Sequence, residues 1–405
     1  MLRVLRDTVY ARLFSAQVVA LLGTGLLTVA LGLLAFDIAG DAAGSVLGTA
    51  LTIKMVAYVG VAPLIAALVD RLPRKAVLIT ADAVRLVIAL LLPAVSETWQ
   101  IYVLVFVLQS ASATFTPAFQ SLIPAVLPDP KDYTRALSLS RLAYDLEALL
   151  SPLIAGALLT VISFHDLFAG TAIGFALSAL LVLSTPLPRA EDGLPATSFW
   201  QRLPAGAAVF ARTPTLRFLL LTNMVVAAGT AIVLVNSVVY ARAVFALDDA
   251  ALALALACYG IGSLVTALSI PGIVERLGVI RTMSIGAAVI VAGLLAAVIV
   301  TGIAAAGGAG WSALLGTWVL LGIGTSLVNT PSSRLLADAS TPANRTLVYT
   351  AQFALSHACF LLTYPIAGWL GAVSLIGAAG ALLGIALAAA TAAIAFARHR
   401  LHQTA

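Results

Sequence analysis

The residues with the clearest chemical potential lie in the stretch SRLAYDLEALLSPLIAG, which runs from Ser140 to Gly156. Arg141, Asp145 and Glu147 fall within seven consecutive positions there, and apolar sequence follows them. At about 100° per residue, Arg141 and Asp145 share one face of a helix and predict an ion pair, whereas Glu147 is turned about 200° from Asp145. We therefore predict that Arg141 is a structural or gating charge. Glu147 is the first candidate for carrying a proton, and Asp145 is a further candidate.

Three other apolar segments carry ionisable side chains. His357 shares a helix face with Thr350 and Tyr364, and an imidazole titrates near neutral pH, so it is a candidate proton carrier or, as an alternative, a packing residue. Lys54 lies one turn before Tyr58, and it either lines a cavity or extends its long stem to the membrane surface.

Asp82 and Arg85 are three positions apart near the start of another apolar segment, a spacing that predicts a structural pair.

The composition identifies what surrounds these residues. The chain has 405 residues, of which 61% are hydrophobic and 10% charged, and its mean hydropathy is +1.08. Soluble domains are roughly 25% charged, so these values indicate a polytopic membrane protein. The net charge of +5 is explained by arginines at helix ends and does not require a nucleic-acid partner. Cys258 and Cys359 stand singly in apolar sequence and indicate packed residues, with no disulfide framework.

Segments of about 20 mostly apolar residues can cross a bilayer as helices. Such segments predict an all-α integral membrane fold with twelve transmembrane helices, near residues 13–36, 46–69, 76–95, 100–127, 137–162, 167–187, 215–241, 250–274, 280–304, 310–336, 346–370 and 373–396. The longest polar interval falls between the sixth and the seventh. We therefore expect an N-terminal six-helix half over 1–186, a cytoplasmic linker over 187–214 and a C-terminal half over 215–405.

Arginine and lysine are concentrated in alternate connections, where seventeen of them fall, while the opposite connections hold Arg242 beside six acidic residues. By the positive-inside rule, both termini are cytoplasmic. We expect a multi-pass protein of a prokaryotic inner membrane. The N-terminus shows no small-residue cleavage site before its apolar run, so a removable signal peptide is not expected.

The two halves share short sequence echoes. Asp70-Arg71-Leu72 matches Glu275-Arg276-Leu277 at an offset of 205 residues (275 − 70), and TPAFQSLIP at Thr116 matches TPSSRLLAD at Thr330. A third echo joins SPLIAGALL at Ser151 to YPIAGWLGA at Tyr364. Repeats at comparable offsets indicate a duplicated six-helix unit, which is typical of alternating-access transporters.

The connection AALVDRLPRK resembles the signature G-x-x-x-D-R-x-G-R-[RK] of the major facilitator superfamily of secondary transporters. Asp70, Arg71, Arg74 and Lys75 fall on its charged positions. The stretch AFQSLIPAVLPDPKDYTRALSLSRLAYDLEALLSPLIAGAL further resembles an efflux branch with macrolide, siderophore and nickel-resistance exporters. The resemblance implies two pseudo-symmetric halves and export. From this signature, the internal repeat and the helical spacing together, we predict gating or structural roles for one set of charges: Asp70, Arg71, Arg74, Asp82, Arg85, Arg141, Glu275 and Arg276.

The chain departs from that family pattern at three places. Two signature glycines are replaced by Ala66 and Pro73, and the antiporter signature of helix 5 is reduced to Ser151-Pro152 with Gly156. Helix 4 has Gln109 in the region of the family's usual arginine. Helix 1 has Gly-Thr-Gly where many drug exporters have Gly-Asp.

The resemblance makes helices 1, 4, 7 and 10 the ones that line a central cavity. Each has a polar face by helical spacing, although small polar residues also hold helices together. The candidates for contact with substrate are Gln17, Lys54, Tyr58, Gln109, Thr116, Gln120, Asn223, Trp318 and Asn329.

Other functional classes find less support. None of the three lysines follows a glycine, so the phosphate-binding loop of an ATPase is absent, as are a nucleophile elbow and an H-E-x-x-H zinc motif. The sequence shows no selectivity-filter run. We expect a monomeric, proton-driven exporter of an amphipathic or cationic drug-like compound in the lipid bilayer, without a cofactor. The alternatives are a nickel- or cobalt-type metal exporter and a proton-coupled uptake symporter.

Because Glu147 and Asp145 are expected on different faces of one helix, we predict that replacing them has different effects on transport. Glu147→Gln should abolish the pH dependence of transport and leave expression intact, because it removes the titrating group. Asp145→Asn should mainly lower folding yield or impair gating, because it removes a structural partner. Transport at several pH values, measured with the amount of folded protein, separates the two. Equal behaviour of the two variants would contradict the assignment.

Overall fold

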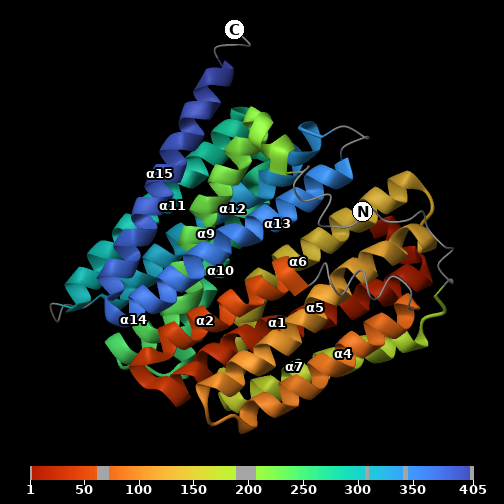
Figure 1. The fold of residues 1–405 in the computed structure, drawn as a ribbon, viewed down its shortest axis with the longest axis horizontal. Helices are drawn as coiled ribbons and strands as arrows, with labels where there is room; N and C mark the ends of the chain where they lie inside the picture. The colour runs from red at the N-terminus through yellow and green to blue at the C-terminus, as the bar shows by residue number, and fades with distance from the viewer. Residues whose placement is uncertain (1, 62–72, 188–206, 306–309, 341–344, 402–405) are drawn as a thin grey trace. The chain divides into compact units, whose positions relative to one another are not determined.

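The structure is a computed structural model, and it describes residues 2–61, 73–187, 207–305, 310–340 and 345–401 (Figure 1). Nearly all residues in these ranges are helical, and the described ranges contain no β-strand. This agrees with the predicted all-α fold. A bilayer offers no water to backbone N–H and C=O groups, so a spanning chain satisfies them within its own helices.

Twelve α-helices of 14 residues or more lie in the described ranges. They are α1 Thr8–Ala39, α2 Ala43–Val56, α4 Arg74–Leu91, α5 Thr98–Val126, α6 Pro130–Leu159, α7 Phe164–Ser184, α9 Pro214–Val238, α10 Asp249–Leu277, α11 Val279–Ala305, α12 Trp311–Asp338, α13 Arg345–Pro365 and α15 Leu375–Leu401. Short helical pieces join or flank some of them, namely η1 Leu2–Arg6, η2 Gly40–Ala42, η3 Ala57–Val61, η4 Leu92–Ala94, η5 Val239–Val244, η6 Ile366–Leu370 and α14 Gly371–Val373.

Each predicted span overlaps one of these helices, but the boundaries differ. Helix α6 begins at Pro130, seven residues before its predicted start at 137, because the Asp129 carboxylate accepts the backbone N–H of Asp132 at 3.1 Å and caps a polar first turn. By length and composition, ten runs in the described chain could cross a membrane. Thr8–Gly60 forms one of these runs, and α6 is outside them, so the count of twelve spans stays a prediction.

The helices gather into two compact units. The first comprises Met1–Leu34 and Val56–Ala196, and the second comprises Ala35–Met55 and Thr197–Ala405. The outer part of α1 and most of α2 therefore pack with the second unit. The predicted half boundaries and linker stay a prediction, since most of 187–214 lies outside the described residues.

A charged pair lies at the centre of the first unit. Asp82 and Arg85 on α4 form an ion pair, and the Ser178 hydroxyl of α7 donates to the second Asp82 oxygen at 2.7 Å. The Arg85 guanidinium lies between the rings of Phe115 and Phe175, 4.4 and 4.6 Å from their centroids. Three helices are thus joined through one buried charge pair.

The depth of this pair differs from the predicted position near the start of the helix. Helix α4 begins at Arg74, so Asp82 lies 8 residues further on (82 − 74), or about 12 Å along the axis. Both residues are buried, Asp82 completely. The pair therefore lies inside the helix and not at its start.

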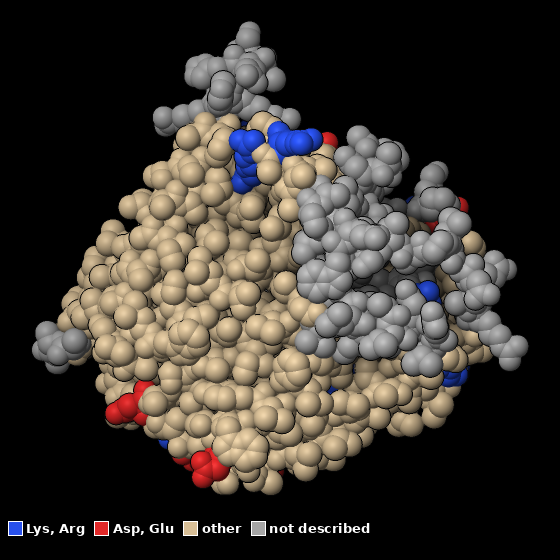
Figure 2. Space-filling model, viewed as in Figure 1, with Lys and Arg blue, Asp and Glu red and all other residues tan. Residues whose placement is uncertain are grey.

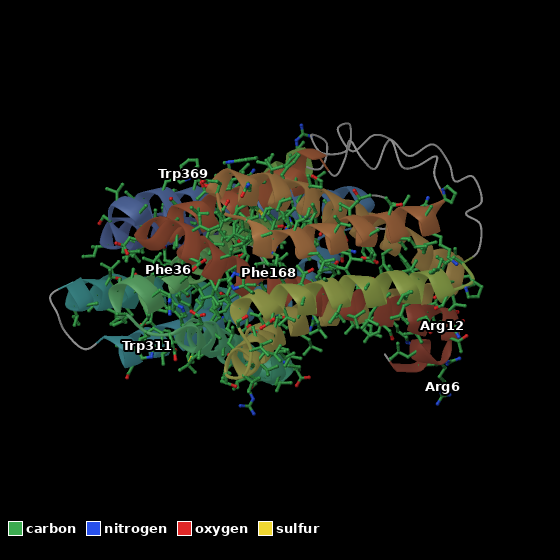
Figure 3. The ribbon with its side chains drawn as sticks, turned by 90° about the horizontal axis from the view of Figure 1, so that it is seen from below. Arg6, Arg12, Phe36, Phe168, Trp311 and Trp369 are labelled. Atoms are coloured by element: carbon green, nitrogen blue, oxygen red, sulfur yellow. The ribbon has the colours of Figure 1, made fainter. Side chains whose placement is uncertain are left out.

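Basic side chains hold one end of the first unit. The Lys75 ammonium donates to the carbonyls of Leu183 and Thr185 at 2.7 and 2.8 Å, and Arg12 donates to the carbonyl of Ser184 at 3.2 Å. These carbonyls end α7, where a helix carries partial negative charge. Arg6 and Arg12 lie together at this end of the unit, away from Phe168 (Figure 3).

Hydrogen bonds between small polar and aromatic side chains join the helices of the second unit. The Trp318 indole of α12 donates to the Ser237 hydroxyl of α9 at 2.6 Å, and its ring meets Tyr240 edge to face. The Trp369 indole of η6 donates to the Thr49 hydroxyl of α2 at 2.9 Å. Such contacts replace the hydrophobic effect as the force between helices in lipid.

One face of the molecule shows how the charges are distributed (Figure 2). Blue and red atoms lie towards the ends of the helices, and a broad area between them is tan. Exposed large apolar side chains such as Leu268 and Val373, 77% and 85% accessible, are expected where lipid is the solvent.

The buried pair predicts a test of stability. Asp82→Asn should lower the free energy of unfolding by about 3–5 kcal/mol, because it leaves the Arg85 charge buried without its carboxylate. The double change Asp82→Leu with Arg85→Met should be far less harmful, because it removes both charges and keeps apolar volume. Thermal unfolding in detergent measures both. A double variant less stable than the single one would contradict this account.

Candidate functional site

The interface of α1 and α6 in the first unit positions the principal candidate. The Tyr10 hydroxyl donates to the Ala136 carbonyl at 3.1 Å, and the Ser140 hydroxyl donates to the Gln17 side-chain oxygen at 2.9 Å. Residue numbers rise together along both helices, so α1 and α6 run parallel. Gln17 and Ser140 are both almost fully buried, at 3% and 2% exposure. The predicted cavity residue Gln17 therefore has a partner within the unit.

Further along the same interface, the Glu147 carboxylate lies against the backbone of α1. A Cβ atom added at Gly25 would be 2.8 Å from a Glu147 carboxylate oxygen and would overlap the Ser151 hydroxyl. The absence of a side chain at Gly25 thus leaves the space that these two groups occupy. Ser151 is buried and its hydroxyl has no hydrogen-bond partner within the described part of the chain, so a polar group lies beside Glu147.

Two tyrosines and an arginine share the electrostatic environment of Glu147. Tyr58, in the π-helical segment η3, interacts electrostatically with Tyr144, Arg85 and Glu147. The sequence pattern paired Tyr58 with Lys54 by spacing and assigned Arg85 to a pair near the helix start. It missed the approach of Arg85 to this cluster, because that contact depends on how α4, α6 and η3 pack.

The remaining candidates of the first unit have different surroundings. Gln109 of α5 is 6% exposed, and its side-chain oxygen has no hydrogen-bond partner in the described ranges. Arg74 is half-buried at the first position of α4. The other predicted residues of this unit lie outside the described residues or have side chains that do: Asp70, Arg71, Thr116, Gln120, Arg141 and Asp145. Their roles stay predictions.

In the second unit, two basic side chains interact. The charge of Lys54 on α2 acts on His357 of α13. The His357 ring donates through Nδ1 to the Phe353 carbonyl at 2.7 Å, and its centroid lies 4.2 Å from the Phe353 ring. Because Nδ1 carries this hydrogen, Nε2 is the nitrogen that would exchange a proton.

The amides of α9 include one that the sequence pattern missed. The side-chain nitrogen of Asn223, one of the predicted cavity residues, is buried and has no hydrogen-bond partner among the described residues. Neither amide atom of the fully buried Asn236 has a hydrogen-bond partner in the described chain. Its oxygen lies beside Gly44 and Gly371, where an added Cβ would be 3.2 and 2.9 Å away. In the sequence, Asn236 could have been noticed only as an asparagine inside the apolar run VLVNSVVY.

Other candidates in this unit are placed as follows. Trp318 is completely buried and bonded to Ser237, so its polar atom is engaged in helix packing. Asn329 is half-buried on α12, while Glu275 and Arg276 are exposed at the end of α10. Within the described part of the chain, no three His, Cys, Asp or Glu residues are grouped closely enough to hold a metal ion.

Residues 13–305 match the sequence model of the Major Facilitator Superfamily, which covers more than half of the chain. The chain belongs to this superfamily. It is therefore a membrane transporter, not an enzyme, and a multi-pass integral membrane protein.

The curated relatives are distant. The chain is 29% identical over 168 residues to an uncharacterized MFS-type transporter of Bacillus subtilis, a match that covers 40% of each chain. It is 24% identical over 218 residues to macrolide efflux protein A of Streptococcus pyogenes, covering 52% of this chain and 53% of that protein. The matches thus span about half the length of these relatives or less.

Solved structures show the same fold. A POT family transporter in complex with a thioalcohol-conjugated peptide has a TM-score of 0.73 at 12% identity and covers 96% of both chains. A bacterial homologue of the iron transporter ferroportin, in an inward-facing state, has a TM-score of 0.71 at 15% identity, over 96% of this chain and 98% of that one. These likenesses establish the major facilitator fold that the sequence motifs indicated.

The contact at Gly25 predicts a selective effect on transport. Gly25→Ala should displace the Glu147 carboxylate, lower the transport rate and shift its pH profile, because a methyl group would occupy the carboxylate's space. Gly23→Ala is the matched control: its Cβ would face Thr171 of α7, 3.0 Å from the carbonyl oxygen, on another side of α1. Proteoliposome transport across a pH series measures both. Identical pH profiles for the two variants would argue against this role.

Proposed function

We propose that the protein is a proton-coupled exporter of a small amphipathic or cationic drug-like molecule, working by alternating access. The superfamily supports secondary transport, and the similarity to macrolide efflux protein A supports export. The energy source in this proposal is the proton gradient, with no cofactor. Two six-helix halves, 1–186 and 215–405, joined by the cytoplasmic linker 187–214, would rock around the substrate.

The observation that carries the proposal is the placement of Glu147. An ionised carboxylate near the middle of a span is unfavourable by about 2.5–3.5 kcal/mol on insertion scales. Here it lies against the glycine backbone of α1 with Ser151 beside it and Tyr58 within electrostatic reach. Protonation removes the charge without moving the helix, so the proton has a defined place to bind.

The same carboxylate explains why a cation is a suitable substrate. A cationic group and a proton both neutralise Glu147, so each weakens the binding of the other at that site. Exchange of one for the other is the thermodynamic requirement of antiport, since coupling between two ligands is reciprocal. Gln109 and Asn223 each have a buried amide atom without a hydrogen-bond partner among the described residues, which supports keeping each as a candidate for substrate contact within its own unit.

The location and orientation are part of the proposal. Both termini lie in the cytoplasm of a prokaryotic cell and the helices cross its inner membrane, because basic residues gather in the connections assigned to that side. We propose a monomer. Two alternatives are included in the experiment below: export of a nickel- or cobalt-type ion, and proton-coupled uptake. No contact in the described residues favours either.

Transport in proteoliposomes tests the function. Vesicles with an imposed pH gradient are offered a macrolide, a monovalent cationic dye, and Ni²⁺ or Co²⁺ separately. We expect the organic cations to move against the proton flux, with Glu147→Gln abolishing the dependence on the gradient. The ion gradient is collapsed with an ionophore as the control.

The outcomes divide the alternatives. Movement of the organic compounds at a rate that ignores the gradient would refute proton coupling. Accumulation together with protons would show uptake and reverse the proposed direction. Gradient-driven movement of Ni²⁺ or Co²⁺ alone would establish the metal exporter in place of the drug exporter.

A further inference from the structure

A pocket of about 500 Å³ opens at one end of the second unit, where α9 and α11 begin and α10 and α12 end. Its volume falls in the range of about 300–1,000 Å³ that is typical of small-molecule sites. Since the apolar spans stop here, the pocket lies at the level of the membrane surface. Its lining does not include Glu147, Lys54 or His357.

Residues at two helix N-termini line this pocket. Helix α11 has 27 residues and starts at Val279, one residue after α10 ends, and the N–H groups of its first turn have no acceptor within the helix. Helix α9 has 25 residues and starts with Pro214 and then Thr215, which lines the pocket. The N-terminus of a long helix carries partial positive charge, so both ends favour an anion.

A buried hydroxyl in the same pocket points independently to a ligand. Thr215 is 4% exposed, and its side-chain oxygen has no hydrogen-bond partner among the residues that the structure describes. A buried hydroxyl without a partner is unfavourable by roughly 1–3 kcal/mol, and a bound acceptor would relieve this. Arg281, on the first turn of α11, adds a guanidinium to the lining. A phosphate oxygen is the acceptor that suits this combination.

The pocket lining also includes one acidic residue. Asp338, the last residue of α12, also lines the pocket, at the helix end that carries partial negative charge. Within the described residues, Asp338 and Arg281 form no ion pair with each other. Leu277 and Leu335 supply apolar surface between them. A ligand that fits such walls has an anionic part, a cationic part and an apolar neighbour.

We propose that this pocket binds a phosphoethanolamine-type group, with the phosphate on the α11 N-terminus, Arg281 and Thr215, and the ammonium on Asp338. The apolar lining and the position at the membrane surface favour a phospholipid headgroup as the source, although a soluble compound has the same chemistry. On the predicted orientation, the pocket faces the cytoplasmic leaflet.

Native mass spectrometry of the full-length protein in detergent tests the proposal, with phosphatidylethanolamine and phosphatidylglycerol added in turn. Arg281→Gln should weaken phosphatidylethanolamine binding about tenfold or more, because a hydrogen bond to a charged group is lost. Thr215→Val should weaken it less. Asp338→Asn should abolish the preference for phosphatidylethanolamine over phosphatidylglycerol, because the ammonium loses its partner.

Matched controls lie next to the pocket. Arg276 and Glu275 are exposed at the end of α10 and do not line the pocket, so Arg276→Gln and Glu275→Gln should leave binding unchanged. Equal effects of Arg276→Gln and Arg281→Gln would overturn the proposal, as would equal binding of both lipids by the wild type. Because Arg281 and Asp338 are exposed, their variants should keep the wild-type melting temperature.

Competition identifies the source of the group. Soluble phosphoethanolamine that displaces the lipid at comparable concentration would support the site with a free compound as its ligand. Phosphoethanolamine that fails to displace it, together with the variant effects above, would support the lipid headgroup.

Discussion

The structure depends on keeping charge and polar groups satisfied inside a medium that contains no water. In the first unit this is achieved by Asp82 and Arg85, whose pair joins α4 to α7 through Ser178 and to α5 and α7 through two aromatic rings. A buried pair of this kind is weak evidence for stability, because desolvation opposes the attraction. The pair instead fixes how the three helices pack. Either charge buried without the other would be strongly unfavourable, so an arrangement of the helices that separates them is disfavoured.

The same constraint makes Glu147 informative. Its carboxylate lies at a helix interface where Gly25 leaves room and Ser151 offers a hydroxyl. In our proposal, this carboxylate changes its charge state during the transport cycle. In the second unit, the charge of Lys54 acts on the His357 imidazole.

Several features could be predicted from sequence because they depend on local pattern. Apolar runs of membrane length placed the helices, and the motif around Arg74 and Lys75 pointed to the superfamily that the family match established. The spacing of Asp82 and Arg85 anticipated their pair, although it misjudged their depth. Helical spacing assigned Glu147 and Asp145 to different faces and different roles. The side chain of Asp145 is outside the described residues, so this assignment is still a prediction.

The sequence by itself determined the class of the protein: apolar length, the distribution of arginine and lysine, and repeated motifs are properties of single segments. The tertiary structure decided which side chains meet. Gly25 faces Glu147, Arg85 approaches Tyr58, and Asn236 is buried beside Gly44 because of helix register and close backbone approach, which no periodicity encodes. The pocket at Thr215 and Arg281 has the same origin. Its walls come from four helix ends in three separate parts of the chain, around residues 215, 277–281 and 335–339, which converge through packing.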